Sequence, residues 1–537
     1  MRNFDYGLTS PVEVSIIDNI MGSGKTTKMI EKIKLDIATK PEQPILIVVP
    51  YLDEIRRYLV SINGLDHGRI DEWMRDEEGN IIIGKDNKIV FDYNSISQLR
   101  DTGFKMPIVK SGKSKTTNLR ELLRGCNNII TTHSLYTQWD EGISDMIRSG
   151  QYRVIVDEEL EAFRSINISR LGRQEAKALI EDNYITVNEE HKVVWNEDKD
   201  ERDGSFTGND KYREIRKYAL DGDLYIYGDL LKEERPFIAW SVPKSFYCCA
   251  SSYHIMTYRF QASFLAAYFK HNNIPFTFES RAKTSIYDDI ELKSKARELI
   301  EIVSTPKSLV GRGTMYSHSY LNSLTKEEID KTKKALTDTL TRTYKVPATD
   351  LLMTHSQQFA YYDDKTKTDA AGNYIKNNRK DKKILTPTKY KDCHVAFSCK
   401  GTNDFSNRNF VVYLHNVYPN SAISRYMKDK NIPFDEEEYA LSVMLQFIWR
   451  SAIRKGEAIK LMIPSLRMHR MFTEWLGKEE EILNGISAYE LISDTGEVVK
   501  FYNQDKFCEE RSLDSTAISR VLAGERMTHK GWRLNSK

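Results

Sequence analysis

A glycine-rich stretch near the start of the sequence has the residue types that can hold the phosphates of a nucleotide. Residues 14–27 read VSIIDNIMGSGKTT, so a β-branched run leads into a loop and then into apolar residues at helical spacing. Glycines let backbone N–H groups turn toward a phosphate, and a helix N-terminus adds the positive end of its dipole. The predicted nucleotide contacts are Gly22, Ser23, Gly24, Lys25, Thr26 and Thr27.

Two side chains of this loop have specific predicted roles in binding ATP with Mg²⁺. Lys25 is expected to reach the β and γ phosphates, and the Thr26 hydroxyl to hold Mg²⁺. Asn19 replaces the first glycine of the usual G-x-x-x-x-G-K-T pattern, at a position that starts the turn without contacting the transferred phosphate. The alternative is an accidental GSGKTT in a structural turn, which the strand pattern before the loop and the helical pattern after it disfavour.

A second stretch, KSGKSKTT at residues 110–117, also contains a GKS triplet. Lys110, Lys113 and Lys115 would repel one another around a single phosphate group, and the first glycine of the pattern falls on Pro107. We therefore interpret this stretch as a basic surface loop near DNA and not as the nucleotide site.

An acidic pair in YRVIVDEELEAF, residues 152–163, supplies what ATP hydrolysis needs besides the phosphate loop. Val154–Val156 is a buried-type strand, and Asp157 and Glu158 follow at its carboxyl end, where open α/β sheets bind their ligands. Asp157 is predicted to hold the water shell of the metal, and Glu158 to orient the attacking water. The alternative is a solvated acidic turn at the start of a helix.

Two further motifs, ILIVVPYLDEI at 45–55 and NNIITTHSLY at 127–136, lie between the glycine-rich loop and the acidic pair. Four more follow the acidic pair: FYCCASSY, TMYSH, CKGTNDFSNRN and QFIWRSAIRKGE. The ordered set resembles superfamily 2 DNA helicases, especially those encoded by bacteriophages, with a likeness to the herpesvirus origin-binding proteins around MGSGKTT. The resemblance spans about residues 12–475 and implies ATP and Mg²⁺ as cofactors, single-stranded or forked duplex DNA as partner, and possible contacts with replication proteins.

The resemblance also assigns roles to residues outside the phosphate loop. Contacts with the DNA backbone are implied for Pro50, Thr132, His133 and Ser134. Ala250–Ser252 would couple hydrolysis to domain movement.

In QFIWRSAIR, Gln446 would contact the γ-phosphate side, and Arg450 and Arg454 would be arginine fingers reaching across from a second lobe. The family places its arginines four and seven residues after the glutamine, whereas here they fall four and eight, so both stay candidates. Arginine suits this task because its planar fork stays charged and binds phosphate with two hydrogen bonds. The alternative is an amphipathic helix that packs apolar residues such as Phe447 and carries solvated arginines.

Alternating strand and helix patterns predict an α/β protein with mostly parallel sheets in two RecA-like P-loop lobes. We place the first lobe at about residues 1–268, the second at 269–487 and a small DNA-binding module at 488–537. An insertion at about 164–236 includes the mixed-charge run NEDKDERDGS, which is most simply a solvated loop. A second, at about 363–391, is basic and either contacts phosphates or is an exposed loop.

The tail resembles small helix-turn-helix modules appended to phage proteins and intron endonucleases. Its DTG turn at 494–496 predicts a hairpin, followed by helices at 504–511 and 515–523. The outward face of the second helix would present Thr516, Ser519 and Arg520 to a DNA groove, while Lys530 and Arg533 could hold phosphates. A purely structural helical hairpin is the alternative.

The composition indicates a cellular compartment but does not identify a binding partner. The six cysteines form no CxxC pair, and the N-terminus lacks a signal-peptide pattern, so we expect a reduced, cytoplasmic protein, in a phage-infected bacterial cell if the resemblance holds. A net charge of +2 gives little global attraction to nucleic acid, so DNA binding would need local basic patches.

The predicted function is an ATP-dependent DNA helicase or translocase acting in phage DNA replication or recombination. A DNA-packaging motor ATPase is an alternative, although the C-terminal part shows no clustered carboxylates for a two-metal nuclease. An ATP-switched DNA-binding regulator is another, which Glu158 and the arginine pair disfavour because a switch needs no fast hydrolysis.

Overall fold

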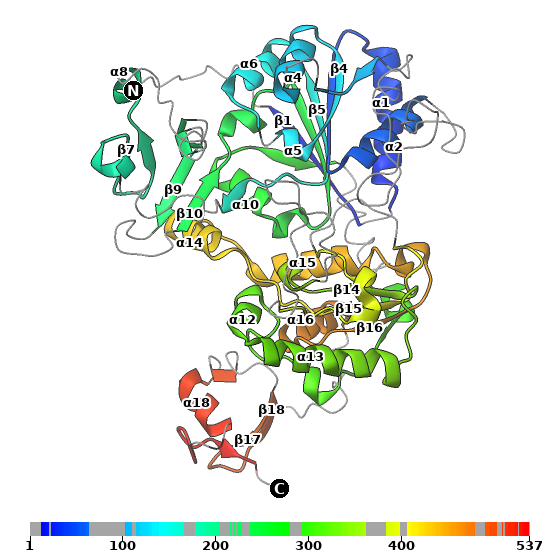
Figure 1. Cartoon of the computed structure of the whole chain (residues 1–537), viewed down its shortest axis with the longest axis vertical. Coiled ribbons are helices and arrows are strands. Elements are labelled where there is room, and N and C mark those ends of the chain that lie inside the picture. The colour runs from blue at the N-terminus through cyan, green and yellow to red at the C-terminus, as the bar shows by residue number, and fades with distance from the viewer. Residues whose placement is uncertain are drawn as a thin grey trace, which may run out of the picture. The chain divides into compact units, whose positions relative to one another are not determined.

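The chain divides into two compact units, Met1–Asp289 with Pro419–Ser442, and Ile290–Tyr418 with Val443–Lys537 (Figure 1). The lobe boundaries expected at residues 268 and 487 stay predictions. The computed structural model describes residues 12–20, 23–63, 103–109, 114–136, 138–165, 178–202, 215–216, 218–220, 223–227, 237–279, 293, 295–360, 383–397, 405–477, 489–501, 507–508, 511–522, 524 and 526–535.

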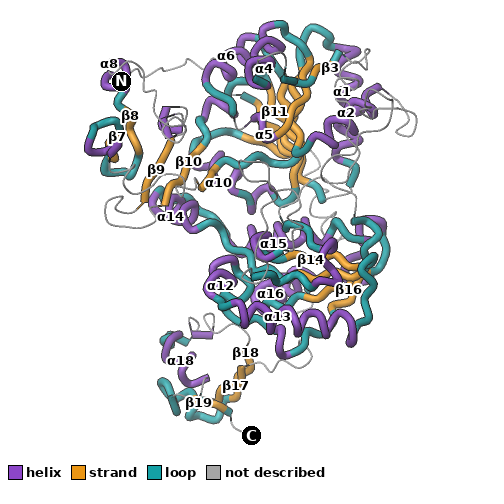
Figure 2. Tube along the Cα trace, in the orientation of Figure 1, coloured by secondary structure: helices purple, strands orange, loops and turns teal. Residues whose placement is uncertain are grey.

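The first unit is built on a seven-stranded sheet in the order β12-β1-β11-β5-β2-β4-β3, in which every pair of neighbours runs parallel (Figures 1 and 2). Its strands are β1 (Glu13–Asp18), β2 (Ile45–Val49), β3 (Phe104–Lys105), β4 (Asn128–Thr132), β5 (Arg153–Asp157), β11 (Ser252–Thr257) and β12 (Phe276–Phe278). Its helices are α1 (Lys25–Thr39), α2 (Leu52–Asn63), α4 (Lys115–Arg124), α5 (His133–Tyr136), α6 (Glu141–Ser149) and α10 (Phe264–His271).

Both faces of this sheet are apolar, as a parallel sheet covered by helices requires. In β2, Ile45, Ile47 and Val49 pack in one cluster with α1 and α2. Leu46 and Val48 point the other way, into a second cluster with α4, α6 and α10. The continuous β-branched runs of the sequence therefore form central strands with two buried faces.

The insertion after β5 is a folded part of the first unit. It contributes β6 (Phe163–Ser165), β7 (Ile185–Val187), β8 (Val193–Trp195), α8 (Glu197–Arg202) and β9 (Asp223–Tyr227). β6 and β9 flank β10 (Phe237–Ser241) in an antiparallel sheet, and β7 and β8 form a hairpin.

The expectation of a simple solvated loop in this insertion was wrong for the described residues. Trp195, Leu224 and Ile226 are buried in the main core of the first unit, and the charged run at 197–202 is helical. Helix α14 (Ser421–Asp429) also belongs here, because Tyr426 packs on Phe163 and Tyr225 with ring centroids 5.3 and 4.7 Å apart.

The second unit contains a four-stranded parallel sheet in the order β13-β16-β15-β14. Its strands are β13 (Ile300–Ile302), β14 (Leu351–Thr354), β15 (Phe410–Tyr413) and β16 (Ile459–Met462). Its helices are α12 (His318–Ser323), α13 (Lys326–Asp338), α16 (Leu466–Leu476) and the second half of α15 (Glu436–Ile448). The prediction of an α/β protein with mostly parallel sheets is thereby confirmed.

The described part of the tail is a small body with its own core. β17 (Tyr489–Ile492) pairs antiparallel with β18 (Val498–Phe501), which confirms the predicted hairpin, and also with β19 (Arg533–Leu534), a strand that sequence reasoning missed. Helix α18 (Ser515–Leu522) matches the second predicted helix. The first predicted helix, at 504–511, lies largely outside the described residues. Within that range Phe507 and Cys508 are described as helical.

Within the ranges that the structure describes, no helix combines the length and the apolar composition that crossing a membrane would need.

Candidate nucleotide site

Three parallel strands bring the predicted nucleotide residues to one edge of the first sheet. β11 lies between β1 and β5, with Asp18 in register with Thr257, and Met256 with Asp157. The carboxyl ends of these strands therefore carry the loop before α1 and the acidic pair after β5 side by side.

The backbone of the loop explains which glycine the chain needs. Gly24 caps α1 with φ of 81°, a left-handed conformation that favours glycine. Asn19 does not adopt a positive φ, and its N–H donates to the Thr257 carbonyl oxygen at 3.1 Å. Asparagine therefore fits where the usual pattern has glycine. Gly22 lies outside the described residues, and Ser23 and Thr27 are exposed.

Lys25, the first residue of α1, turns its ammonium back toward the loop. Nζ donates to the carbonyl oxygens of Asn19, of Ile20 at 3.4 Å and of Thr257 at 3.0 Å. Carbonyl dipoles hold the charge at the floor of the loop, and a phosphate group would offer it a stronger, fully charged partner.

The Thr26 hydroxyl, at the start of α1, contacts the Asp157 carboxylate at the end of β5. Thr26 Oγ1 donates to Asp157 Oδ2 at 3.2 Å, although the two residues are 131 positions apart in the sequence. One hydroxyl and one carboxylate at this distance fit the protein share of a Mg²⁺ site whose other ligands are waters and nucleotide phosphates. When bound there, Mg²⁺ would neutralise charge on the phosphates.

Asp157 is buried, at 7% exposure, and two residues of α2 surround it. The Tyr58 hydroxyl donates to Asp157 Oδ2 at 2.9 Å, and Arg57 forms an ion pair with the same oxygen at 3.5 Å. Burial raises the pKa of Asp157, as does the charge of Glu158, whereas Arg57, the Tyr58 hydrogen bond and Lys25 act in the opposite direction.

Sequence reasoning missed these α2 residues. Glu54, Arg57 and Tyr58 recur at the spacing of one helix face. Arg57 and Tyr58 contact Asp157, and Glu54 pairs with Arg57. Polar residues at this spacing, directly after a buried strand, were the available signal.

Glu158 has a backbone conformation that few non-glycine residues adopt. Its φ is 64°, in the left-handed region, and its side chain is half-buried directly after Asp157. Such conformations cost about 1 kcal/mol or more and are concentrated at functional sites. The predicted role of Glu158 in orienting water stays a prediction.

The four residues assigned to DNA lie at the same sheet edge. Pro50 follows β2, and Thr132 ends the neighbouring strand β4, in register with Val49. His133 begins α5, and its Nε2 lies 2.9 Å from the carbonyl oxygen of Asp157, while Ser134 is exposed. DNA contact by these residues stays a prediction, but His133 directly contacts the acidic strand end.

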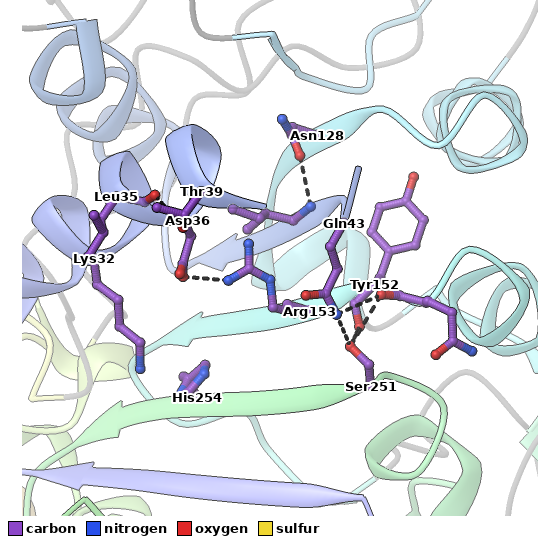
Figure 3. A network of polar contacts seen from close by, with 12 residues as sticks. Lys32, Leu35, Asp36, Thr39, Gln43, Asn128, Tyr152, Arg153, Ser251 and His254 are labelled. Atoms are coloured by element: carbon purple, nitrogen blue, oxygen red, sulfur yellow. Dashed lines mark hydrogen bonds and ion pairs between the residues drawn. The ribbon is translucent and has the colours of Figure 1, made fainter. Parts of the chain in front are cut away.

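Ala250–Ser252, to which the resemblance assigns the coupling of hydrolysis to domain movement, lie at the opposite edge of the sheet, and that role stays a prediction. Ser252 is in register with Glu13 and Arg153, the first residues of β1 and β5. Figure 3 shows Ser251 in a polar network at this amino-terminal edge, where Oγ accepts from Gln43 Nε2 at 2.9 Å. The residues of β11 that reach the nucleotide edge are instead at its end, from Thr257 onward.

The second glycine-lysine stretch is described only from Ser114 onward. The Ser114 hydroxyl caps α4 by accepting from the Thr117 N–H at 3.1 Å. Ser114 thus has an ordinary helix-capping role, and Lys115–Thr117 are helical and not part of a loop. The interpretation of the stretch as something other than the nucleotide site stays a prediction.

The residues assigned to the second lobe differ in exposure. Gln446 is half-buried on α15, Arg450 follows the end of the helix at 6% exposure, and Arg454 is half-buried in a short 3₁₀ helix. Phe447 is fully buried, as the packing alternative expects, but Arg450 is not solvated as that alternative requires.

In the tail, the predicted division of α18 into two faces is confirmed. Ile518 and Val521 are buried with Phe507 and Trp532, whereas Thr516, Ser519 and Arg520 are exposed. Lys530 Nζ donates to the Ser512 carbonyl oxygen at 2.7 Å, so this ammonium supports the turn before α18. Arg533 is exposed in β19.

Comparisons with known sequences give a partial match and one relative. A family model described as the YonV C-terminal Rossmann-like domain matches residues 294–476, which contain the parallel sheet of the second unit. The SPbeta prophage-derived uncharacterized protein YonV of Bacillus subtilis (strain 168) is 26% identical over 463 residues, which cover 86% of this chain and 98% of that protein.

Solved structures show only distant likeness. XPD in its apo form aligns over 88% of this chain and 96% of its own, with 14% identity and a TM-score of 0.38. The DUF1998 helicase MrfA, bound to DNA and AMPPNP, aligns over 99% of this chain and 58% of its own, with 11% identity and a TM-score of 0.29. A DEAD box protein from the hyperthermophile Methanococcus jannaschii aligns over 88% of each chain, with 9% identity and a TM-score of 0.24.

Proposed function

We propose that this protein is an ATP-dependent DNA helicase or translocase of the superfamily 2 type. The observation that carries the proposal is the approach of Thr26 Oγ1 to Asp157 Oδ2 at 3.2 Å, directly after the glycine-capped lysine at the start of α1. Hydroxyl, carboxylate and lysine come together at the sheet edge where phosphate-binding α/β proteins hold their nucleotides.

In this proposal each residue of the first unit has one task. Lys25 leaves its loop carbonyls to pair with the γ-phosphate, and Thr26 and Asp157 hold Mg²⁺. Glu158 orients the attacking water from its left-handed backbone position. Gln446 and the arginines after α15 complete the site from the second unit when the two lobes close, so that hydrolysis and movement depend on each other.

DNA is the proposed partner for two reasons. Pro50, Thr132, His133 and Ser134 lie at or directly after the ends of neighbouring strands at the nucleotide edge, and an exposed polar face of α18 is available in the tail. The prophage origin of the YonV relative supports a phage setting, such as DNA replication or recombination in an infected bacterial cell. We also propose that the tail is a helix-turn-helix module that binds DNA.

A turnover assay tests the proposal. Lys25→Ala should abolish ATP hydrolysis because the γ-phosphate loses its point charge, and Glu158→Gln should still bind ATP but hydrolyse it very slowly. Hydrolysis is measured with and without single-stranded DNA, and Lys113→Ala, at the lysine of the GKS triplet in the second glycine-lysine stretch, is the matched control. Wild-type turnover in Lys25→Ala together with loss of turnover in Lys113→Ala would move the nucleotide site to the second stretch.

The same assay separates the alternatives. A helicase or translocase should hydrolyse ATP faster when single-stranded DNA is added, and a packaging motor should respond to duplex ends instead. An ATP-switched regulator should bind ATP with little turnover under either condition.

A further inference from the structure

The end of β11 is tied to the nucleotide loop by backbone and side-chain contacts within the first unit. The Thr257 carbonyl oxygen accepts from Lys25 Nζ at 3.0 Å and from the Asn19 N–H at 3.1 Å. Two and three residues after Thr257, the N–H groups of Arg259 and Phe260 donate to the Asp18 carboxylate at 2.7 and 2.9 Å. A displacement of Lys25 or of the loop therefore changes the surroundings of the segment from Thr257 to Phe260.

Arg259 projects from this segment with an unusual backbone. Its φ is 55°, in the left-handed region, where a non-glycine residue needs support from its surroundings. The two hydrogen bonds to Asp18 provide that support. In this conformation Arg259 Nη2 donates to a carboxylate oxygen of Glu438, which lies in the first turn of α15.

The ion pair is partly shielded from water. The Arg259 side chain is 17% exposed and that of Glu438 is 45% exposed, so solvent screens the pair less than it screens a fully exposed pair. On the same turn of α15, Tyr439 packs on Phe264 with ring centroids 4.7 Å apart. The pair therefore lies beside an aromatic contact that fixes the helix start.

The start of α15 also lies near the acidic segment that follows Asp157. Burial raises the pKa of the Tyr439 hydroxyl, and the nearby carboxylates of Glu159 and Glu161 raise it further. The first turn of α15 is therefore close to both segments that leave the candidate nucleotide site, the one after β11 and the one after β5.

α15 continues as one helix from Glu436 to Ile448, and its chain passes from the first unit into the second after Ser442. Gln446 follows Glu438 by about two helical turns on the same rigid element. Glu438 and Gln446 are thus parts of the same helix.

We propose that the Arg259–Glu438 ion pair is a positioning contact that transmits nucleotide binding at Lys25 to α15. Neither residue touches the nucleotide; Arg259 acts through Thr257 and Asp18, and Glu438 acts through the helix. The inference rests on the proposed function, because it requires that the Lys25 loop binds ATP.

Hydrogen exchange along α15 tests the contact without requiring hydrolysis. The full chain is compared with and without a non-hydrolysable ATP analogue and Mg²⁺, as wild type and as Arg259→Gln and Glu438→Gln. In the wild type the analogue should slow exchange over residues 436–448 by about 5-fold or more, the scale of a modest coupling free energy. Both variants should lose this effect while binding the analogue within about 2-fold of the wild type, because neither residue touches it.

Two further variants separate transmission from a merely structural role. Arg259→Lys keeps the charge and should retain most of the effect, whereas Arg148→Gln, which breaks an exposed pair with Asp145 elsewhere in the first unit, should leave it intact. Full protection of α15 in Arg259→Gln and Glu438→Gln would overturn the inference, as would a wild type whose α15 does not respond to bound analogue.

The ATPase assay distinguishes this failure from failure of the proposed function. A wild type that protects α15 on binding the analogue but hydrolyses no ATP would remove the proposed function and leave the contact standing. DNA-stimulated hydrolysis that is unchanged in both variants, with α15 unprotected in all proteins, would remove the contact and leave the function. A chain that binds no analogue would overturn both.

Discussion

The two candidate arginine fingers differ in what surrounds them. Arg450 is 6% exposed in the core of the second unit, whereas Arg454 is half-buried in a 3₁₀ helix bounded by Gly456. A finger must reach a phosphate on another lobe, and a buried guanidinium must first leave its partners, at a cost of several kcal/mol. The surroundings of Arg454 are therefore the better suited to that role.

Arg454→Ala should lower kcat by about 10³-fold and leave nucleotide binding nearly unchanged, the scale known for arginine fingers. Arg450→Ala should mainly lower the unfolding temperature, because it removes a buried side chain. Turnover, nucleotide binding and thermal unfolding of both variants decide the assignment. A kcat loss confined to a well-folded Arg450→Ala would reverse it.

At this scale the sequence predicts residues that a local motif brings together, such as Lys25 and Thr26. Asp157 was also predictable, because a buried strand ending in a carboxylate is a local pattern. Tyr58, which donates to Asp157 at 2.9 Å, was not, because it comes from a helix about a hundred positions earlier and its pairing depends on the sheet order.

At the scale of elements, the strand order decides which residues share an edge. In FYCCASSY, Phe246 and Tyr247 pack in a 3₁₀ turn after Pro243, and β11 begins only at Ser252. The motif therefore lies at the start of β11, at the edge opposite the candidate nucleotide site. The apolar content of a motif does not fix at which end of a strand it lies.

The opposite edge carries an ion pair that joins α1 to β5. Arg153 and Asp36 are in contact, with side chains 9% and 15% exposed, within the network of Figure 3. Asp36→Asn should lower the free energy of unfolding by about 3 kcal/mol, because it leaves a buried guanidinium without its counter-charge.

Urea unfolding of the full chain measures this effect. Asp145→Asn is the matched control, because its pair with Arg148 is 56% and 35% exposed and should contribute at most about 1 kcal/mol. Equal, small losses in both variants would show that Arg153 finds compensating partners and that the pair does not hold α1 to the sheet.

At the scale of the whole molecule, the net charge does not indicate where DNA would bind. The net charge of +2 is too small to attract a polyanion by itself, so affinity must come from local surfaces. The tail offers one, since Arg520 is exposed on α18 and its buried face packs on a core separate from those of both sheets. The predicted nucleotide residues end at Arg454, well before this core begins.

We therefore expect the tail to recruit DNA without powering movement. A chain ending before residue 486 should keep basal ATP hydrolysis but bind duplex or forked DNA more weakly, and the difference should shrink as salt rises, because phosphate contacts dominate such affinity. Arg520→Ala should reproduce part of the loss, whereas Lys530→Ala should act mainly on the turn before α18, where its ammonium bonds to Ser512. Binding is measured by fluorescence anisotropy across a salt series. Equal binding and unwinding of forked DNA by the shortened and full chains at low salt would assign DNA recruitment to the two units and leave the tail a structural role.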